Sequence, residues 1–250
     1  MAAPSQILEF DRITKNFGGL RAIDDLSFSI EKGKVTALIG PNGAGKTTAI
    51  NLISRVYAPT SGNIYYEGQS VLDWSAHEVA RRGIARTFQI IKLFPSLNVV
   101  ENVMIGRDFG FKGRIARQAA HAVRFEMDSA MELLARFHLQ DCALMMPDEL
   151  SLGQQRWLEL ARAIALEPSL LLLDEPSSGL NLAEAEALLE NLRNVCRGGC
   201  TILLIEHNMR VMSAISDYVV VLNHGQKLLT GTPDEIKNDQ KVIEVYLGEE

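Results

Sequence analysis

Residues 40–47 read Gly40-Pro41-Asn42-Gly43-Ala44-Gly45-Lys46-Thr47 and follow a short apolar run, Val35–Ile39. They satisfy the pattern G-x-x-x-x-G-K-[ST], in which glycines let the backbone bend around phosphate groups with its amides facing inward. Lys46 is placed to reach the outer phosphates, and the Thr47 hydroxyl is placed to ligate Mg²⁺ at the start of a helix. This segment, the phosphate loop, predicts a strand, a phosphate-binding turn and a helix in succession.

The composition is that of an ordinary globular protein, with 47% apolar and 22% charged residues in a chain of 250. A net charge of −6 without a dominant basic stripe argues against nonspecific nucleic-acid binding as the main role. No apolar run approaches the roughly 20 residues of a membrane-spanning helix. Residues 1–6 show no basic start followed by an apolar core, so we expect no secretion signal. We therefore expect a cytoplasmic chain that meets a membrane only through partners.

The cysteines do not indicate a disulfide framework or a metal site. There are three, Cys142, Cys196 and Cys200, and an odd number fits free thiols in a reducing compartment. Cys196, Cys200 and the later His207 lack a fourth ligand at a sensible spacing, which argues against zinc.

The remaining pattern predicts an α/β fold with a largely parallel sheet. Strands are expected at Ile7–Phe17 and Leu26–Ile30, and a helix over Lys46–Tyr57. Capping boxes at Ser75 and Thr232 predict two further helix starts. Continuous apolar runs, typical of strands covered on both faces, occur at Leu170–Leu173, Thr201–Ile205 and Tyr218–Leu222.

A change of character marks a helical insertion. Between residues 94 and 149 the β-branched runs give way to helix formers. We expect one domain, with an α/β core over residues 1–93 and 168–250 and a helical subdomain over residues 94–167.

Two adjacent carboxylates follow the strand predicted at Leu170–Leu173. This strand delivers Asp174 and Glu175 to the carboxyl edge of the sheet, where ligands of α/β folds usually lie. Alternation along the strand points neighbours in different directions, so Asp174 can face Mg²⁺ while Glu175 orients or deprotonates a water. The alternative is an exposed acidic strand end, which the phosphate loop makes the weaker interpretation.

A second motif, the signature segment Leu150–Gln154, opens a stretch of helical period that continues to Ala165. Ser151 is a good N-cap, and the amides and positive dipole end of its helix favour a phosphate presented from outside. Gly153 permits close approach. Leu-Ser-x-Gly in isolation is typical of a simple capped helix.

Together these motifs resemble those of the ATP-binding subunits of ATP-binding-cassette (ABC) transporters over essentially the whole chain. The family's phosphate loop matches Gly40–Thr48, its signature matches Leu150–Gln154, its acidic strand matches Leu170–Glu175, and its switch histidine matches His207. The resemblance implies an ABC-type nucleotide-binding fold with a mixed or parallel sheet core, an N-terminal antiparallel β part and a helical subdomain. It also implies that two copies enclose ATP between the phosphate loop of one and the signature of the other. The implied ATP contacts are Phe17, Gly40, Pro41, Asn42, Gly43, Ala44, Gly45, Lys46, Thr47, Thr48, Ser151, Gly153 and Gln154.

The resemblance also implies roles in catalysis. Mg²⁺ would be held by Thr47, Gln89 and Asp174, and catalysis would depend on Lys46, Gln89, Glu175 and His207. Gln89 is assigned from the family alone, as a loop residue that contacts Mg²⁺ and relays to a membrane subunit.

Aromatic and histidine residues need separate interpretation. Phe17 lies where the family carries an aromatic residue that stacks on adenine, and packing in the core at a strand end is the alternative. His207 follows the strand predicted at Thr201–Ile205 and can reach the γ-phosphate. The other histidines lack such a placement and are expected to be solvated or packed: His77, His121, His138 and His224.

One loop departs from the family. Ser178-Gly179-Leu180-Asn181 stands where Ser-Ala-Leu-Asp is common, so Asn181 keeps an acceptor but loses a charge at the dimer seam. Glu175 is intact, and we expect an active ATPase.

Within the family, segments such as Phe17–Ile23, Ala85–Gln89 and Gly231–Ile236 are most similar to the branched-chain amino-acid uptake group. This similarity implies a peripheral ATPase on the cytoplasmic face of the membrane, paired with a second ATP-binding subunit. Its other partners would be two integral membrane permease subunits and a substrate-binding protein, with no nucleic acid. Alternatives are a urea, lipid or export transporter, or a non-transport module gated by nucleotide. Phe94 and Leu97 fit either core packing or a groove for a helix of a membrane subunit.

Overall fold

The computed structural model describes residues 6–87, 90–109 and 122–247, and within them the chain forms two sheets. The larger has six strands in the order β10-β9-β3-β8-β7-β6, with parallel pairing except between β9 and β10. Its strands are β3 (Val35–Ile39), β6 (Ile84–Arg86), β7 (Leu170–Asp174), β8 (Thr201–Ile205), β9 (Tyr218–Asn223) and β10 (Gln226–Gly231).

The smaller sheet is antiparallel, has four strands in the order β2-β1-β4-β5, and is built from the N-terminal part of the chain. Its strands are β1 (Gln6–Phe17), β2 (Leu20–Glu31), β4 (Ser61–Tyr66) and β5 (Gln69–Ser70). Their burial alternates along much of each strand, as expected for a sheet with one face on the core.

The central strands are buried on both faces. Along β7, Leu170 and Leu172 belong to the core cluster shared with the antiparallel sheet and α1 (Lys46–Ile53). Leu171 and Leu173 belong to the cluster on the opposite face, which is covered by helices. This double coverage explains why the run has no polar alternation.

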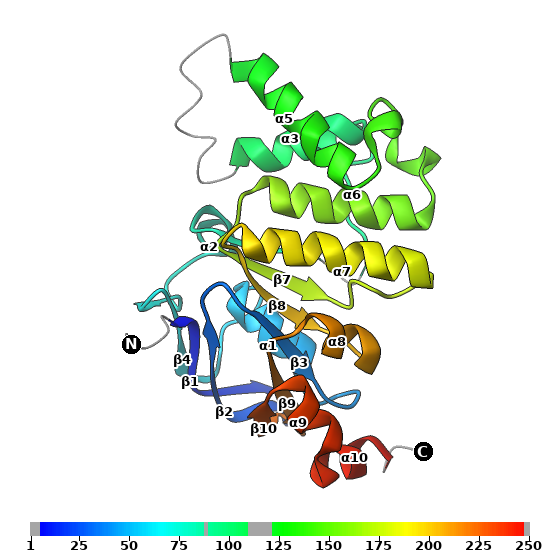
Figure 1. Cartoon of the computed structure of the whole chain (residues 1–250). Helices are drawn as coiled ribbons and strands as arrows, with labels where there is room; N and C mark the ends of the chain where they lie inside the picture. The colour runs from blue at the N-terminus through cyan, green and yellow to red at the C-terminus, as the bar shows by residue number, and fades with distance from the viewer. Residues whose placement is uncertain (1–5, 88–89, 110–121, 248–250) are drawn as a thin grey trace, which may run out of the picture.

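Helices from the middle of the chain gather at one end of the molecule, above the sheet in the view of Figure 1. They are α3 (Val99–Phe109), α5 (Ala122–Arg136) and α6 (Leu152–Ala165), with 3-10 turns at Gln140–Cys142 and Pro147–Glu149. The other helices are α2 (Ala76–Arg81), α7 (Leu182–Arg197), α8 (Met209–Ile215), α9 (Pro233–Asn238) and α10 (Gln240–Leu247). None of the helices in the described ranges is long and apolar enough to cross a membrane.

The capping boxes predicted at Ser75 and Thr232 are both present, and they start α2 and α9. Two predicted boundaries were wrong. β2 begins at Leu20, several residues before the predicted start, because its N-terminal end pairs with β1 through the turn after Phe17.

The helix predicted over Lys46–Tyr57 ends at Ile53. Arg55 has a positive φ of 56°, which an α-helix does not accommodate, and the amides of Val56 and Tyr57 both donate to the carbonyl of Asn51. The chain therefore turns out of the helix before Pro59 could stop it.

Candidate functional site

The carboxyl ends of the parallel strands meet at one edge of the large sheet. The phosphate loop follows β3, Glu175 follows β7, His207 lies two residues after β8, and His224 follows β9. A cavity of about 550 Å³ opens there. From the loop it is lined by Asn42, Gly43, Gly45, Lys46, Thr47 and Thr48, and Phe17, Glu175, His207 and His224 complete much of its wall.

Glycine is required at two points of the phosphate loop. Gly40 has a φ of 144°, and a Cβ there would lie 2.1 Å from the carbonyl oxygen of Leu222. Gly45 has a φ of 100°, and its Cβ would lie 2.7 Å from the Ala22 carbonyl oxygen. Both positions combine a backbone that side chains rarely adopt with a neighbour that cannot move aside. The tight wrapping of the loop therefore depends on these glycines.

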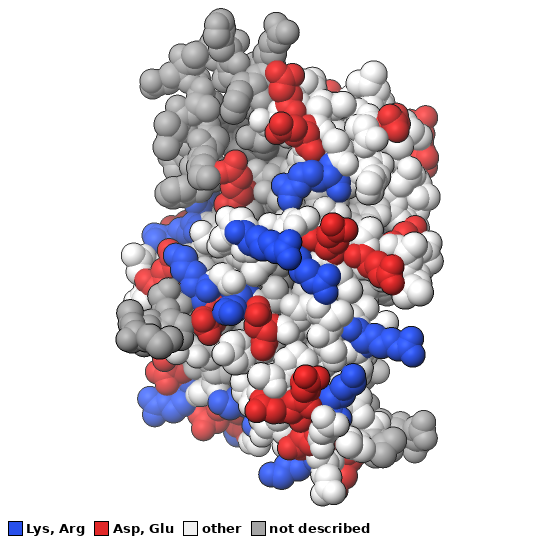
Figure 2. All heavy atoms as spheres, in the orientation of Figure 1, with Lys and Arg blue, Asp and Glu red and all other residues white. Residues whose placement is uncertain are grey.

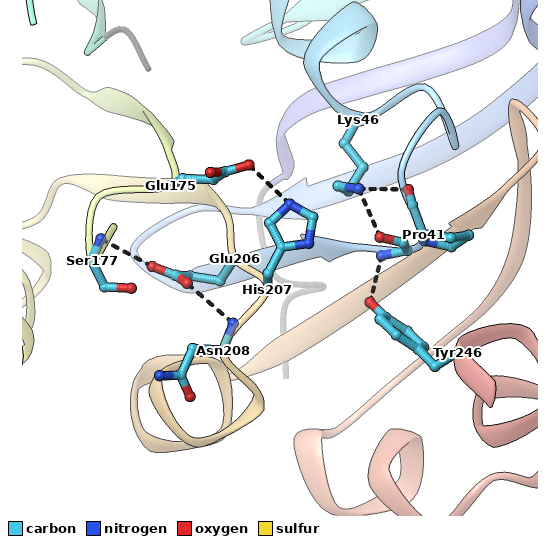
Figure 3. Close-up of polar contacts among 9 residues, drawn as sticks. Pro41, Lys46, Glu175, Ser177, Glu206, His207, Asn208 and Tyr246 are labelled. Atoms are coloured by element: carbon cyan, nitrogen blue, oxygen red, sulfur yellow. Dashed lines mark hydrogen bonds and ion pairs between the residues drawn. The ribbon is translucent and has the colours of Figure 1, made fainter. Parts of the chain in front are cut away.

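Lys46 is folded onto its own loop. Its Nζ donates to the carbonyl oxygens of Gly40 and Pro41, each at 2.7 Å, and the side chain is buried (Figure 3). A buried ammonium group requires such partners because desolvation of an unpaired charge is costly. The cation is thus held inside the loop, where it can meet an incoming phosphate.

Glu175 and His207 both line the cavity and contact each other. His207 Nε2 lies 2.9 Å from Glu175 Oε1, and both side chains remain partly exposed (Figure 3). Glu175 has a positive φ of 51°, an uncommon conformation for a residue other than glycine, and its amide donates to the carbonyl of Ile205. The carboxylate is therefore aimed by its backbone and by the imidazole together.

Asp174 is buried beside a cation. Burial raises the pKa of its carboxyl group, and Arg86, whose Nη2 lies 3.8 Å from Asp174 Oδ2, acts in the opposite direction. Oδ2 has no hydrogen-bond partner among the described residues. A buried carboxylate oxygen without a hydrogen-bond donor is suited to bind a metal cation. The Thr47 hydroxyl, on the loop that lines the cavity, supplies a second oxygen.

Phe17 lies at the rim of the cavity and is 39% exposed. Its ring meets the edge of the Tyr57 ring, with centroids 5.1 Å apart, and the Lys15 ammonium lies 4.8 Å from the Phe17 centroid. An exposed, laterally supported ring fits base stacking better than it fits core packing.

The signature segment lies elsewhere. Ser151 Oγ accepts from the Gln154 amide at 3.3 Å, and Gln154 Oε1 accepts from the Ser151 amide at 2.9 Å, so the predicted N-cap of α6 is confirmed. A Cβ on Gly153 would lie 3.0 Å from Glu184 Oε1. These three residues do not line the cavity of the described chain. A single copy thus does not bring the signature to its own phosphate loop.

Asn181 caps α7, since its Oδ1 accepts from the Glu184 amide at 3.0 Å, so the amide side chain already has a local role. Gln89 lies outside the described residues.

Sequence reasoning missed several residues near the site. His224 was expected to lack a site placement, which is wrong because it lines the cavity. The rule that parallel strands end at one sheet edge would have found it, since β9 pairs in parallel with β3. Glu206 was also missed: it is buried, accepts from the amides of Ser177 and Asn208 at 3.2 and 3.4 Å, and burial raises its pKa (Figure 3).

The sheet order and the loop after β3 place the protein among the phosphate-loop nucleotide hydrolases. A family profile described as ABC transporter matches residues 23–178. A second profile, described as branched-chain amino acid ATP-binding cassette transporter, matches residues 226–250. The chain belongs to the ABC transporter family, and it is an ATP-hydrolysing subunit that powers transport across a membrane.

Individual relatives agree with this assignment. BraF of Pseudomonas aeruginosa, a high-affinity branched-chain amino acid transport ATP-binding protein, is 38% identical over 97% of this chain and 98% of its own. The ADP conformation of MJ1267, an ATP-binding cassette of an ABC transporter, superposes with a TM-score of 0.83 at 29% identity, covering 97% and 99% of the two chains.

A dimeric structure of MJ0796, a bacterial ABC transporter cassette, gives a TM-score of 0.80 at 25% identity, covering 90% of this chain and 98% of that one. The comparisons confirm the expected ABC ATPase and its α/β fold with an antiparallel N-terminal sheet and a helical subdomain.

Proposed function

We propose that this protein drives the uptake of branched-chain or other hydrophobic amino acids from the cytoplasmic face of the membrane, as a peripheral subunit. The observation that carries the ATPase part is the Glu175–His207 pair at 2.9 Å, which faces the phosphate loop across one cavity. The match of residues 226–250 to the branched-chain profile supports the substrate class. A urea, lipid or export transporter is the alternative.

In the proposed site, ATP lies with its base against Phe17 and its phosphates on the amides of residues 43–48. The Lys46 ammonium donates to the phosphates, either in place of the Gly40 and Pro41 carbonyl oxygens or in addition to them. Glu175 orients or deprotonates the attacking water, and His207 holds the carboxylate and reaches the terminal phosphate. Positioning and charge stabilisation account for most of the catalysis in such a reaction.

Thr47, Gln89 and Asp174 would hold Mg²⁺, and the Oδ2 of Asp174, which has no hydrogen-bond partner among the described residues, supports this assignment. A bound Mg²⁺ neutralises charge on the phosphates. The protein itself supplies the buried Asp174 carboxylate at the end of β7, whose negative charge is partly balanced by Arg86.

The site is completed by a second ATP-binding subunit. Ser151, Gly153 and Gln154 of one copy would meet the nucleotide held by the other, because the N-terminus of α6 offers free amides and a positive dipole end. Their separation from the cavity of their own chain supports this arrangement, as does the dimeric relative.

Two integral membrane permease subunits and a substrate-binding protein complete the proposed transporter. Ile90 and Phe94, which are 77% and 43% exposed and follow Gln89 in the sequence, offer apolar side chains to a permease helix. The proposed division places the α/β core at residues 1–93 and 168–250 and the helical subdomain at residues 94–167. On the face drawn in Figure 2, basic and acidic side chains are interspersed, which favours protein partners over nucleic acid.

Substitution of Glu175 tests the catalytic part. Glu175→Gln should retain ATP binding and form an ATP-bound homodimer with about twice the 27.6 kDa mass of one chain. Hydrolysis should fall about 100-fold or more because the base is lost. Light scattering and phosphate release measure the two effects. Glu190→Gln, an exposed change on α7, is the control, and undiminished turnover in Glu175→Gln would exclude the base role.

The transport part requires the assembled complex. Proteoliposomes with the permease subunits and binding protein should take up radiolabelled leucine only with ATP and intact Glu175. Recovery of the protein solely with ribosomes or nucleic acid would contradict the proposal.

A further inference from the structure

The phosphate loop is held by a segment from the far end of the chain. The Gly40 amide donates to Tyr246 Oη at 2.9 Å, across 206 residues of sequence (Figure 3). Tyr246 belongs to α10, which lies near the C-terminus beside α9 in Figure 1. A helix near the C-terminus therefore contacts the first residue of the phosphate loop.

A second contact joins the same part of the chain to the other end of the loop. The Gly225 amide, in the turn between β9 and β10, donates to the Ala44 carbonyl oxygen at 3.1 Å. The Gly225 carbonyl accepts from the Asp24 amide at 2.9 Å. The β9–β10 turn and α10 thus contact the phosphate loop at two points, Ala44 and Gly40.

Gly40 is the point where these contacts matter most. Its amide is used by Tyr246, its carbonyl accepts from Lys46 Nζ at 2.7 Å, and any Cβ would collide with Leu222. Gly40 itself is buried. The Tyr246 hydroxyl and the Lys46 ammonium therefore contact the two peptide groups on either side of the Gly40 Cα, so the orientation of Gly40 affects both contacts.

The helix that supplies the tyrosine is anchored. Val242 is 3% exposed and belongs to the core cluster on the helix-covered face of the large sheet, and Tyr246 packs against the same cluster. These positions lie four residues apart and so share a face of α10. The hydroxyl is therefore carried on a supported element.

We propose that Tyr246 is a positioning residue for the phosphate loop, through which α10 holds the loop in its nucleotide-binding conformation. This inference rests on the proposed nucleotide site. Removal of the hydroxyl would leave the buried Gly40 amide without this acceptor and make other loop conformations more accessible. The apparent affinity for nucleotide falls with the fraction of molecules that keep the competent loop.

The test is Tyr246→Phe, which removes only the hydroxyl. The Kd of a fluorescent ATP analogue should rise about threefold to tenfold, and the KM for ATP should rise by a similar factor. The kcat at saturating ATP should be unchanged, because bound nucleotide selects the molecules with the competent loop and the substitution leaves the Glu175–His207 pair intact. Tyr218→Phe removes the hydroxyl of an exposed tyrosine on β9 and is the matched control, with an expected Kd equal to that of the wild type.

Hydrogen exchange supplies a readout on the unaltered protein. Because coupling is reciprocal, nucleotide should slow amide exchange in α10 of the wild type, and this protection should be lost in Tyr246→Phe. A Kd within twofold of the wild type in Tyr246→Phe, or wild-type α10 exchange that ignores nucleotide, would overturn the inference. Lys46→Ala separates the two levels: if it binds as tightly as the wild type, the nucleotide site itself is wrong.

Discussion

At the scale of single residues, Arg86 is a buried cation near the site that contacts two separate elements. Its side chain is 9% exposed, and besides Asp174 it contacts α1 and the turn after it, where Nη1 donates to Asn51 Oδ1 at 2.6 Å and to Ser54 Oγ at 2.9 Å. Burial lowers the Arg86 pKa, and Asp174 opposes that effect. The guanidinium joins the helix that follows the phosphate loop to the strand that carries the acidic pair.

We predict that Arg86→Met lowers the free energy of unfolding by about 3 kcal/mol, because a buried carboxylate would lose its cation. Urea denaturation measures this effect. Lys32→Met breaks the exposed pair with Glu67, whose side chains are 48% and 47% exposed, and should cost less than about 1 kcal/mol. Equal losses in the two variants would show that the Arg86 pair contributes no more than a surface pair.

Glu206 makes stability depend on pH. Burial raises its pKa in the folded protein above the ordinary value of 4.5, so the folded state binds this proton more tightly than the unfolded state. The stability from the group is complete below the ordinary pKa and is lost as the pH rises through the folded pKa. We predict that Glu206→Gln becomes progressively more stable relative to the wild type as the pH rises above about 4.5.

Glu235→Gln should give the opposite sign in the same pH series. Hydrogen bonds from the backbone and side chain of Thr232 lower the Glu235 pKa, so its contribution is present at neutral pH and is lost on acidification. Chemical denaturation across the pH range measures both differences, and parallel curves for the two variants would refute this assignment of signs.

At the scale of elements, helix starts decide where the functional segments lie. α6 and α9 begin with the same device, a capping box in which a hydroxyl accepts the amide three residues later. In α6 that hydroxyl belongs to Ser151, which is also the proposed nucleotide contact. In α9 it belongs to Thr232, which has no such role. A comparison of the two caps therefore distinguishes the loss of helix stability, common to both, from the loss of a nucleotide contact, which concerns Ser151 alone.

We predict that Ser151→Ala and Thr232→Ala each lower the free energy of unfolding by about 1 kcal/mol, the usual loss of an N-cap. Only Ser151→Ala should also slow ATP hydrolysis, by about tenfold, because a hydrogen bond to a charged phosphate is lost as well. Phosphate release measured at matched folded fractions checks this. A comparable loss of activity in Thr232→Ala would assign the effect to stability alone.

At the scale of the whole molecule, the site is a meeting of segments from most of the chain. The cavity joins the end of β1, the loop after β3, and the ends of β7, β8 and β9. Ligand binding at such a junction stabilises every element that contributes to it, since each must stay in place for the cavity to exist.

We predict that ADP at about 100 times its Kd raises the free energy of unfolding by about 2.7 kcal/mol. For a chain of this length the melting temperature should rise by about 5–10 °C. Calorimetry checks this, with Lys46→Ala as the variant that should show little shift at the same ADP concentration. A full shift in Lys46→Ala would place the nucleotide elsewhere.

The sequence by itself determined the local features. The glycine pattern of residues 40–47 requires a tight loop, the continuous run Leu170–Leu173 requires coverage on both faces, and the caps at Ser151 and Thr232 need only their own next turn. These are short-range effects of backbone sterics, hydrophobic periodicity and local hydrogen bonds. They predicted the fold class, which the comparisons confirm, and the positions of the phosphate loop and the acidic pair, whereas Gln89 was assigned from the family resemblance alone.

Tertiary structure alone decided which distant groups meet. The early end of α1 and the bond from Gly40 to Tyr246 across 206 residues have no local signal in these segments. His224 reaches the cavity because β9 pairs in parallel with β3. Each depends on how sheets and helices pack, because burial brings together residues whose separation along the chain carries no information about their distance. The separation of Ser151 from its own phosphate loop is likewise a property of the packed molecule.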